Sequence, residues 1–225
     1  MAKIAAIQLK STGDPAGNLE VAAHYIGQAA RAGAQLVVLP EHFVYYNARD
    51  MRAVAEGENN SGLARQFFAD QSRKYKVWLV AGTLPLFGDG VAAKDTDKPY
   101  ATSLLYDDRG DEIATYRKIH LFDVNVQKTG KRYCESDSYQ HGTHPVVAQT
   151  PCGCIGMSVC YDLRFPELYR QLAAQGAEII VAPSAFRYQS GPRLNHPYIK
   201  PGQTCPGATA PWWSAPFQNS PKKIL

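Results

Sequence analysis

Three continuous apolar runs constrain the fold of this chain more than any other feature of its sequence. They cover residues 35–40, 77–82 and 178–183, and each of them has a glycine or a proline at or near one end. Runs of this kind are typical of strands buried on both faces. Each run follows a stretch whose apolar residues have helical spacing, and such alternating units predict an α/β layered fold.

The other segments fit the same scheme. We expect a helix over residues 15–32, with Asp14 as its N-cap and Pro15 in its first turn. Further helices are expected from Ser61 onward and over residues 165–175, and residues 42–60 are interpreted as a polar loop. Additional strands are expected over residues 4–9, 100–106, 111–116, 145–149 and 152–159, the second and third of them forming a hairpin.

Composition excludes several classes of protein. The 225 residues are 45% hydrophobic, which is enough for one well-buried domain. The net charge of +4 is spread along the chain without a basic run, so a nucleic-acid partner is not expected. No apolar run reaches the ~18 residues of a membrane span, and no signal-peptide pattern opens the chain. Five cysteines, an odd number, favour reduced thiols, and we expect a soluble, cytoplasmic protein.

The character of the chain changes at about Arg187. Beyond it, prolines recur every four or five residues and no helical or strand period is sustained. Each proline removes an amide donor and restricts the residue before it. We therefore expect a domain over residues 1–186 and an extended or disordered tail over residues 187–225, in which Trp212 and Trp213 are able to dock on the body.

Three chemically active side chains stand at the carboxyl ends of expected strands: Glu41, Lys118 and Cys160. Strand carboxyl ends line the ligand crevice of α/β sheets. Cys160 also lies on a sharp strand-to-helix turn, which would expose its thiol beside outward-pointing amides. A carboxylate is able to act as base for a thiol and an ammonium to stabilise an oxyanion, so the three predict an acyl-transfer site.

The segments around these side chains read Leu-Pro-Glu at residues 39–41, Tyr-Arg-Lys-Ile-His-Leu-Phe-Asp at 116–123 and Val-Cys-Tyr-Asp-Leu-Arg-Phe-Pro-Glu at 159–167. They resemble motifs of the nitrilase superfamily of carbon–nitrogen hydrolases. They occur in the order of the family's Glu–Lys–Cys triad, and the resemblance covers residues 1 to about 186. Their residue sequences are most similar to those of the Nit branch of amidases, which act on ω-amides of dicarboxylates or on deaminated glutathione.

The resemblance implies a role for each residue of the triad. Glu41 would be the general base, Cys160 the nucleophile that forms a thioester, and Lys118 the stabiliser of the tetrahedral intermediate together with the N–H of Tyr161. Glu135 matches a second glutamate of the family and is assigned to substrate positioning. The reaction would release ammonia or an amine from a small amide, with no metal or organic cofactor.

Other substrate-binding candidates also come from the resemblance. Ser184 and Ala185 match a segment that lines the acyl pocket, so their backbone is expected to contact substrate. Arg164, beside the turn of the nucleophile, would bind a substrate carboxylate, although pairing with Glu167 or Asp162 is an equal alternative.

The implied fold is a four-layer α-β-β-α sandwich, here incomplete at its C-terminus because the family's segments beyond residue 186 are not found. The family pairs its subunits. Some of the segments that build the interface between subunits are also not found. The sequence therefore leaves open whether this chain forms a homo-oligomer.

Less specific interpretations stand beside this one. A cysteine taken alone is more often a buried core thiol than a nucleophile. Cys152 and Cys154 have no neighbouring histidine, and two thiols alone do not supply enough ligands for a zinc site. Both are therefore interpreted as strand residues. His42 and His120 invite a Cys–His protease hypothesis, but the resemblance makes them supporting or packing residues. A second functional hypothesis is a catalytically impaired variant that at most associates with full-length subunits.

Overall fold

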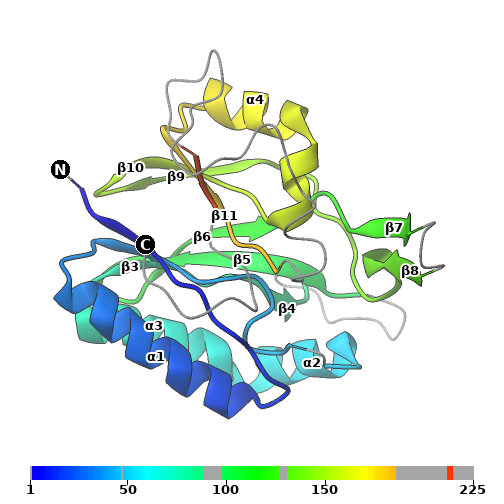
Figure 1. The fold of residues 1–225 in the computed structure, drawn as a ribbon, viewed down its shortest axis with the longest axis horizontal. Helices are drawn as coiled ribbons and strands as arrows, with labels where there is room; N and C mark the ends of the chain where they lie inside the picture. Colours follow the sequence, from blue (N-terminus) through cyan, green and yellow to red (C-terminus); the bar gives the residue numbers. More distant parts are fainter. Residues whose placement is uncertain (1, 47, 89–97, 127–130, 186–211, 215–225) are drawn as a thin grey trace.

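Two β-sheets face each other, and helices cover their outer faces (Figure 1). The computed structural model describes residues 2–46, 48–88, 98–126, 131–185 and 212–214. Helices α1 (Pro15–Arg31) and α3 (Leu63–Tyr75) lie on the first sheet, and α4 (Pro166–Ala174) lies on the second. Among the described residues, no helix combines the length and the apolar character that crossing a bilayer requires.

The first sheet has the order β1-β2-β3-β5-β4, and β6 also pairs with β5. Its strands are β1 (Ile4–Ala6), β2 (Leu36–Val38), β3 (Trp78–Val80), β4 (Leu84–Leu86), β5 (Tyr100–Tyr106) and β6 (Glu112–Arg117). The first three are parallel, with Leu36 in register with Ile4 on one side and with Trp78 on the other. This parallel arrangement brings the carboxyl ends of β1, β2 and β3 to one edge of the sheet.

The second sheet has the order β12-β11-β10-β9. Its strands are β9 (Val146–Thr150), β10 (Gly153–Met157), β11 (Ile179–Ala182) and β12 (Trp212–Ser214). Strands β10, β11 and β12 are parallel, and β9 is antiparallel to β10. A separate hairpin joins β7 (Asp123–Val126) to β8 (Lys131–Cys134) and leads into the 3-10 turn η1 (Glu135–Asp137).

A larger core lies between the first sheet and helices α1 and α3, and a second core fills the space between the two sheets. Its first-sheet side comes from β2, β3, β5 and β6, and its second-sheet side from β9, β10 and β11. Leu36, Tyr116, Ile155 and Met157 are fully buried there. Burial on both faces explains why the central strands are continuous apolar runs rather than alternating patterns.

The expected strands over residues 35–40, 77–82 and 178–183 are confirmed as β2, β3 and β11, and the expected hairpin as β5 and β6. The polar loop expected over residues 42–60 is wrong, because it contains helix α2 (Met51–Ser61). Only Ala55 and Glu58 of that helix are buried, so it has almost no apolar stripe to detect.

Two further expectations concern the ends of the second sheet. Cys152 was expected in a strand but lies in the turn before β10, whereas Cys154 is a buried strand residue as expected. Of the expected tail, the structure describes only Trp212–Ser214, whose backbone pairs with β11. The rest of residues 187–225 lies outside the described residues.

Candidate active site

Cys160 lies on a strained turn directly after the central strand of the second sheet. Strand β10 ends at Met157, and Cys160 opens the 3-10 turn η2 (Cys160–Arg164). Its φ of 44° is left-handed, a conformation that residues other than glycine rarely adopt without support. The support includes its own amide, which donates to the carbonyl oxygen of Pro183 at 3.0 Å.

Glu41 follows β2 and is buried, with both carboxylate oxygens in use. Oε1 accepts from Lys118 Nζ at 2.9 Å, and Oε2 accepts from the amide of Ala185 at 2.9 Å. Gly82 makes this position of Glu41 feasible. A Cβ on Gly82 would lie 2.0 Å from the carbonyl oxygen of Pro40, and its φ of +61° also favours glycine.

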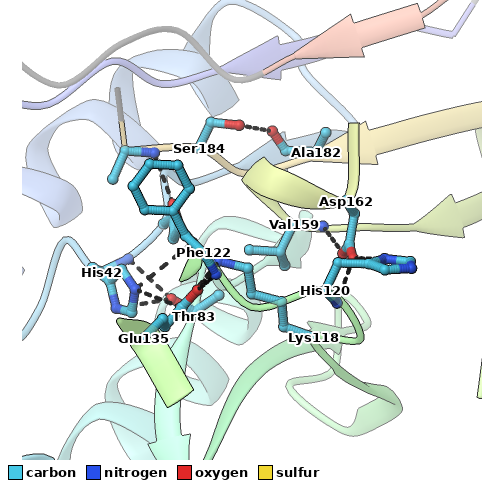
Figure 2. A network of polar contacts seen from close by, with 12 residues as sticks. His42, Thr83, Lys118, His120, Phe122, Glu135, Val159, Asp162, Ala182 and Ser184 are labelled. Carbon is cyan, nitrogen blue, oxygen red and sulfur yellow. Dashed lines mark hydrogen bonds and ion pairs between the residues drawn. The ribbon is translucent and has the colours of Figure 1, made fainter. Parts of the chain in front are cut away.

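Lys118, just past β6, is the buried cation of the site, with only 1% of its surface exposed. Besides Glu41, its Nζ contacts both oxygens of Glu135, at 3.0 and 2.8 Å (Figure 2). Burial alone would lower the pKa of Lys118, but the charges of Glu41 and Glu135 raise it above its usual value. The ammonium is therefore charged at neutral pH and holds two carboxylates together.

The charges around Cys160 determine its resting state. Burial raises the pKa of the Cys160 thiol well above its usual range, and the charge of the adjacent Glu41 carboxylate raises it further. Lys118 and the amide of Ala185 act in the opposite direction, with a smaller effect than burial and Glu41 together. The resting site thus pairs a neutral thiol with a carboxylate able to take its proton.

Glu135, in η1, completes the polar cluster through its contacts with Lys118 and His42. Its Oε2 accepts from the amide of Phe122 at 2.7 Å, and His42 Nε2 lies 3.7 Å from an oxygen of Glu135 and 3.7 Å from one of Glu41 (Figure 2). Burial acts to raise the pKa of Glu135, but the adjacent His42 and the charge of Lys118 lower it to about 2. Glu135 is therefore an anion over the whole physiological range.

Glu41, His42 and Glu135 bring three potential metal-ligand atoms within 4.8 Å of one another. The Lys118 ammonium contacts both carboxylates, at 2.8–3.0 Å. A cation bound between these oxygens would sit against the ammonium and be repelled by it. The donor set of these described residues is therefore better matched to the lysine than to a metal ion.

Tyr139 is an unanticipated neighbour of the cluster. It lies four residues after Glu135, its amide donates to the carbonyl oxygen of Glu135 at 3.0 Å, and its ring lies 5.8 Å from that of His42. Only 4% of Tyr139 is exposed, and its hydroxyl has no hydrogen-bond partner among the described residues. Burial and the charges of Glu135 and Glu41 raise its pKa, so the phenol stays neutral.

The structure also locates the expected substrate-binding residues. The Tyr161 ring packs edge-on against Phe122, with ring centres 5.0 Å apart. Arg164 is exposed on η2 and makes no ion pair within the described part of the chain. The alternative partners of Arg164 are engaged elsewhere, Asp162 with His120 and Glu167 with Arg170.

Ser184 and Ala185 each have a polar group that is hydrogen-bonded within the protein. The Ser184 hydroxyl is buried and donates to the carbonyl oxygen of Ala182 at 2.9 Å (Figure 2). The Ala185 amide donates to Glu41. The segment after β11 therefore helps to hold the expected base, and its contact with substrate stays a prediction.

The sequence profile of the family described as "Carbon-nitrogen hydrolase" matches residues 3–215. A deaminated glutathione amidase of Yersinia enterocolitica is 42% identical over 191 residues, which are 84% of this chain and 65% of that protein. The omega-amidase NIT3 of Saccharomyces cerevisiae is 36% identical and has the same coverage, 84% and 65%. This chain therefore spans slightly less than two thirds of the length of these relatives.

Solved structures agree with this likeness. The crystal structure of Saccharomyces cerevisiae Nit3, a nitrilase-superfamily member, matches with a TM-score of 0.69 and 33% identity, over 85% of this chain and 67% of that one. An amidase of Nesterenkonia, solved with butyramide, matches with a TM-score of 0.70 and 25% identity, over 88% and 69%. In a glutamate-to-glutamine mutant of that amidase, acrylamide has added to the active-site cysteine.

Proposed function

Because this chain belongs to the carbon–nitrogen hydrolase family, we propose that it is an amidase that cleaves the C–N bond of a small, carboxylate-bearing amide. One observation carries the proposal: Glu41 is bonded to the buried ammonium of Lys118 at 2.9 Å, and both charges act on the adjacent Cys160 thiol. A nucleophile, a base and a cation are thereby within reach of one carbonyl group. The activities of the relatives, deaminated glutathione amidase and omega-amidase, indicate the substrate class.

In the first half of the proposed reaction, the Sγ–C bond forms as Glu41 takes the thiol proton. The carbonyl oxygen of the substrate becomes an oxyanion, which Lys118 and the N–H of Tyr161 stabilise. The ammonium has three donors. One contact to Glu41 and a shared contact to the two oxygens of Glu135 leave the third donor for this oxyanion.

In the second half, the proton moves from Glu41 to the leaving nitrogen, the C–N bond breaks and ammonia departs. Cys160 then carries the acyl group as a thioester. Glu41, again a carboxylate, takes a proton from water, which attacks the thioester and releases the carboxylic acid and the thiol. Glu135 acts mainly by holding Lys118 and through it positions the substrate.

The proposal extends to the fold and to substrate recognition. The complete architecture would be the four-layer α-β-β-α sandwich of the superfamily, with residues 1–186 as the catalytic domain. The guanidinium of Arg164 would pair with the distal carboxylate of the substrate. Ser184 and Ala185 would contribute to the wall of the acyl pocket.

Ammonia release from an ω-amide of a dicarboxylate and from deaminated glutathione tests the activity, with Cys160→Ala as the matched control. We expect wild-type turnover at least about 10³-fold above the variant, because the variant lacks the covalent route. Equal background rates in both proteins would refute the amidase proposal. They would leave the hypothesis of an impaired variant, which co-purification with a full-length homologue would test.

The role of Arg164 has its own control, since butyramide lacks a carboxylate. Arg164→Gln is expected to raise KM for the carboxylate-bearing amide about tenfold and to leave KM for butyramide within about twofold. Equal changes in both KM values would contradict recognition of a carboxylate by Arg164.

A further inference from the structure

A second carboxylate, Asp162, is completely buried two residues after the nucleophile and has no access to a substrate. Its Oδ1 accepts from His120 twice, from the amide at 3.0 Å and from Nδ1 at 2.7 Å. Its Oδ2 accepts from the amide of Val159 at 2.8 Å and from the hydroxyl of Tyr116 at 2.7 Å. Four donors thus converge on one carboxylate (Figure 2 draws those from Val159 and His120).

The donors are distributed around both reactive side chains. Val159 immediately precedes Cys160, whereas Tyr116 and His120 lie two residues before and two residues after Lys118. We propose that Asp162 is a positioning residue that fixes the thiol of Cys160 relative to the ammonium of Lys118. This inference rests on the proposed amidase function, which requires both groups at one carbonyl carbon.

The surroundings of Asp162 make this connection stiff. Tyr116 is fully buried in the core between the two sheets. The ring of His120 stacks on Phe165, with centres 3.7 Å apart and planes 6° from parallel, and Phe165 directly precedes α4. The carboxylate therefore links the end of β6, the turn of the nucleophile and the start of α4 as one unit.

Replacement of Asp162 by asparagine preserves the shape of the side chain but not its hydrogen bonds. All four protein groups around the carboxylate donate to it, and an amide offers one acceptor oxygen and one NH2 group. In either orientation the NH2 group faces a backbone N–H, that of Val159 or that of His120. We expect the turn of Cys160 to shift relative to Lys118, and a misplacement of about 1 Å lowers the rate of a chemical step by on the order of 10²-fold.

The experiment compares Asp162→Asn with a matched control, Asp107→Asn. Asp107 is also buried and accepts from the amides of Arg109 and Asp111, at 2.9 Å each, but it lies in the turn between β5 and β6. Three quantities are measured for each protein: the urea unfolding midpoint, kcat and KM for the ω-amide, and the rate at which iodoacetamide alkylates Cys160 as a function of pH. The alkylation needs no turnover.

Both variants are expected to lose stability, but only Asp162→Asn is expected to lower kcat, by on the order of 10²-fold, with KM within about threefold. It is also expected to slow alkylation at pH 8 by about threefold or more, since the thiol loses the nearby charge of Lys118. If Asp162→Asn folds and keeps the wild-type kcat and alkylation rate, or if Asp107→Asn loses kcat equally, the inference is overturned.

Tyr116→Phe decides the question if Asp162→Asn fails to fold, because it removes one donor and leaves the carboxylate in place. A reduced kcat and slower alkylation in this variant would support the inference, and wild-type values would refute it. If the wild-type protein releases no ammonia, the proposed function fails. The alkylation profiles then still establish whether Asp162 controls the environment of Cys160.

Discussion

Replacement of Glu41 by glutamine is expected to have opposite effects on two reactions of the same thiol. Glu41 is adjacent to the Cys160 thiol, and its charge acts to keep the pKa of that thiol high. Glutamine preserves the size of the side chain but removes the charge and the base. Lys118 then becomes the dominant charge near the thiol, and it favours the thiolate.

The size of the effect follows from the contact. Loss of one adjacent like charge lowers a pKa by about 1–3 units, which raises the thiolate fraction at pH 7 by about 10- to 1000-fold. A less basic thiolate is also less nucleophilic, with a Brønsted slope of about 0.4–0.5. The net alkylation rate should therefore rise between about 3-fold and about 50-fold, whereas amide hydrolysis should fall by about 10²- to 10⁴-fold without its base.

The assay is the rate of iodoacetamide addition at pH 7, followed by mass spectrometry of the peptide that contains Cys160. Glu135→Gln is the matched control, since it removes an equal charge from the other side of Lys118 without touching the thiol. We expect a smaller acceleration in this control. A Glu41→Gln protein that is alkylated no faster than wild type would refute the assignment of Glu41 as the group that holds the thiol proton.

Three further predictions concern the stability of the polar cluster. Lys118→Met leaves the buried Glu41 and Glu135 carboxylates without their cation, so urea titrations should show a free energy of unfolding lower by about 3–5 kcal/mol. An unchanged urea midpoint would contradict the pairing of Lys118 with these carboxylates. The pKa of Glu135 falls from 4.5 to about 2 on folding, so its ionisation contributes on the order of 3 kcal/mol to the free energy of unfolding. This contribution is complete above the unfolded pKa and is lost as the pH falls toward 2. Glu135→Gln should therefore weaken the acid dependence of unfolding, and an acid limb identical to wild type would exclude this role. Tyr139→Phe removes a buried hydroxyl that has no partner among the described residues, so calorimetry should show a stability equal to that of the wild type or greater by up to about 1 kcal/mol. A clear loss of stability would show that the hydroxyl is hydrogen-bonded in the folded protein.

The sequence predicted the parts of the fold in which burial leaves a simple pattern. Strands β2, β3 and β11 are buried on both faces and were recognisable as apolar runs. Helix α2 was not predicted from the sequence, because most of its residues face solvent and leave no apolar pattern. Its stability comes from details that periodicity does not report, namely the Asp50 cap on Ala53 and the left-handed Gly62 at its end.

The site was predictable as a set of strand ends and much less so as a set of contacts. Glu41, Lys118 and Cys160 each follow a strand, and the structure brings them together as one cluster. The role of the Ala185 amide depends on a hydrogen bond between residues 144 positions apart, and that of Asp162 depends in part on bonds from residues at least 42 positions away. No local pattern predicts which distant donor meets which acceptor, so these contacts required the three-dimensional structure.

The hydrogen bond from Ala185 to Glu41 joins residues 144 positions apart, and it gives the site a place in the order of folding. Glu41 leaves the ribosome well before its donor, which emerges only after β11 has been synthesised. Contacts of such long sequence separation close late, because the entropy of a large loop must be lost first. The environment of the base is thus completed late in folding, and it is complete only when the segment after β11 has packed against Glu41.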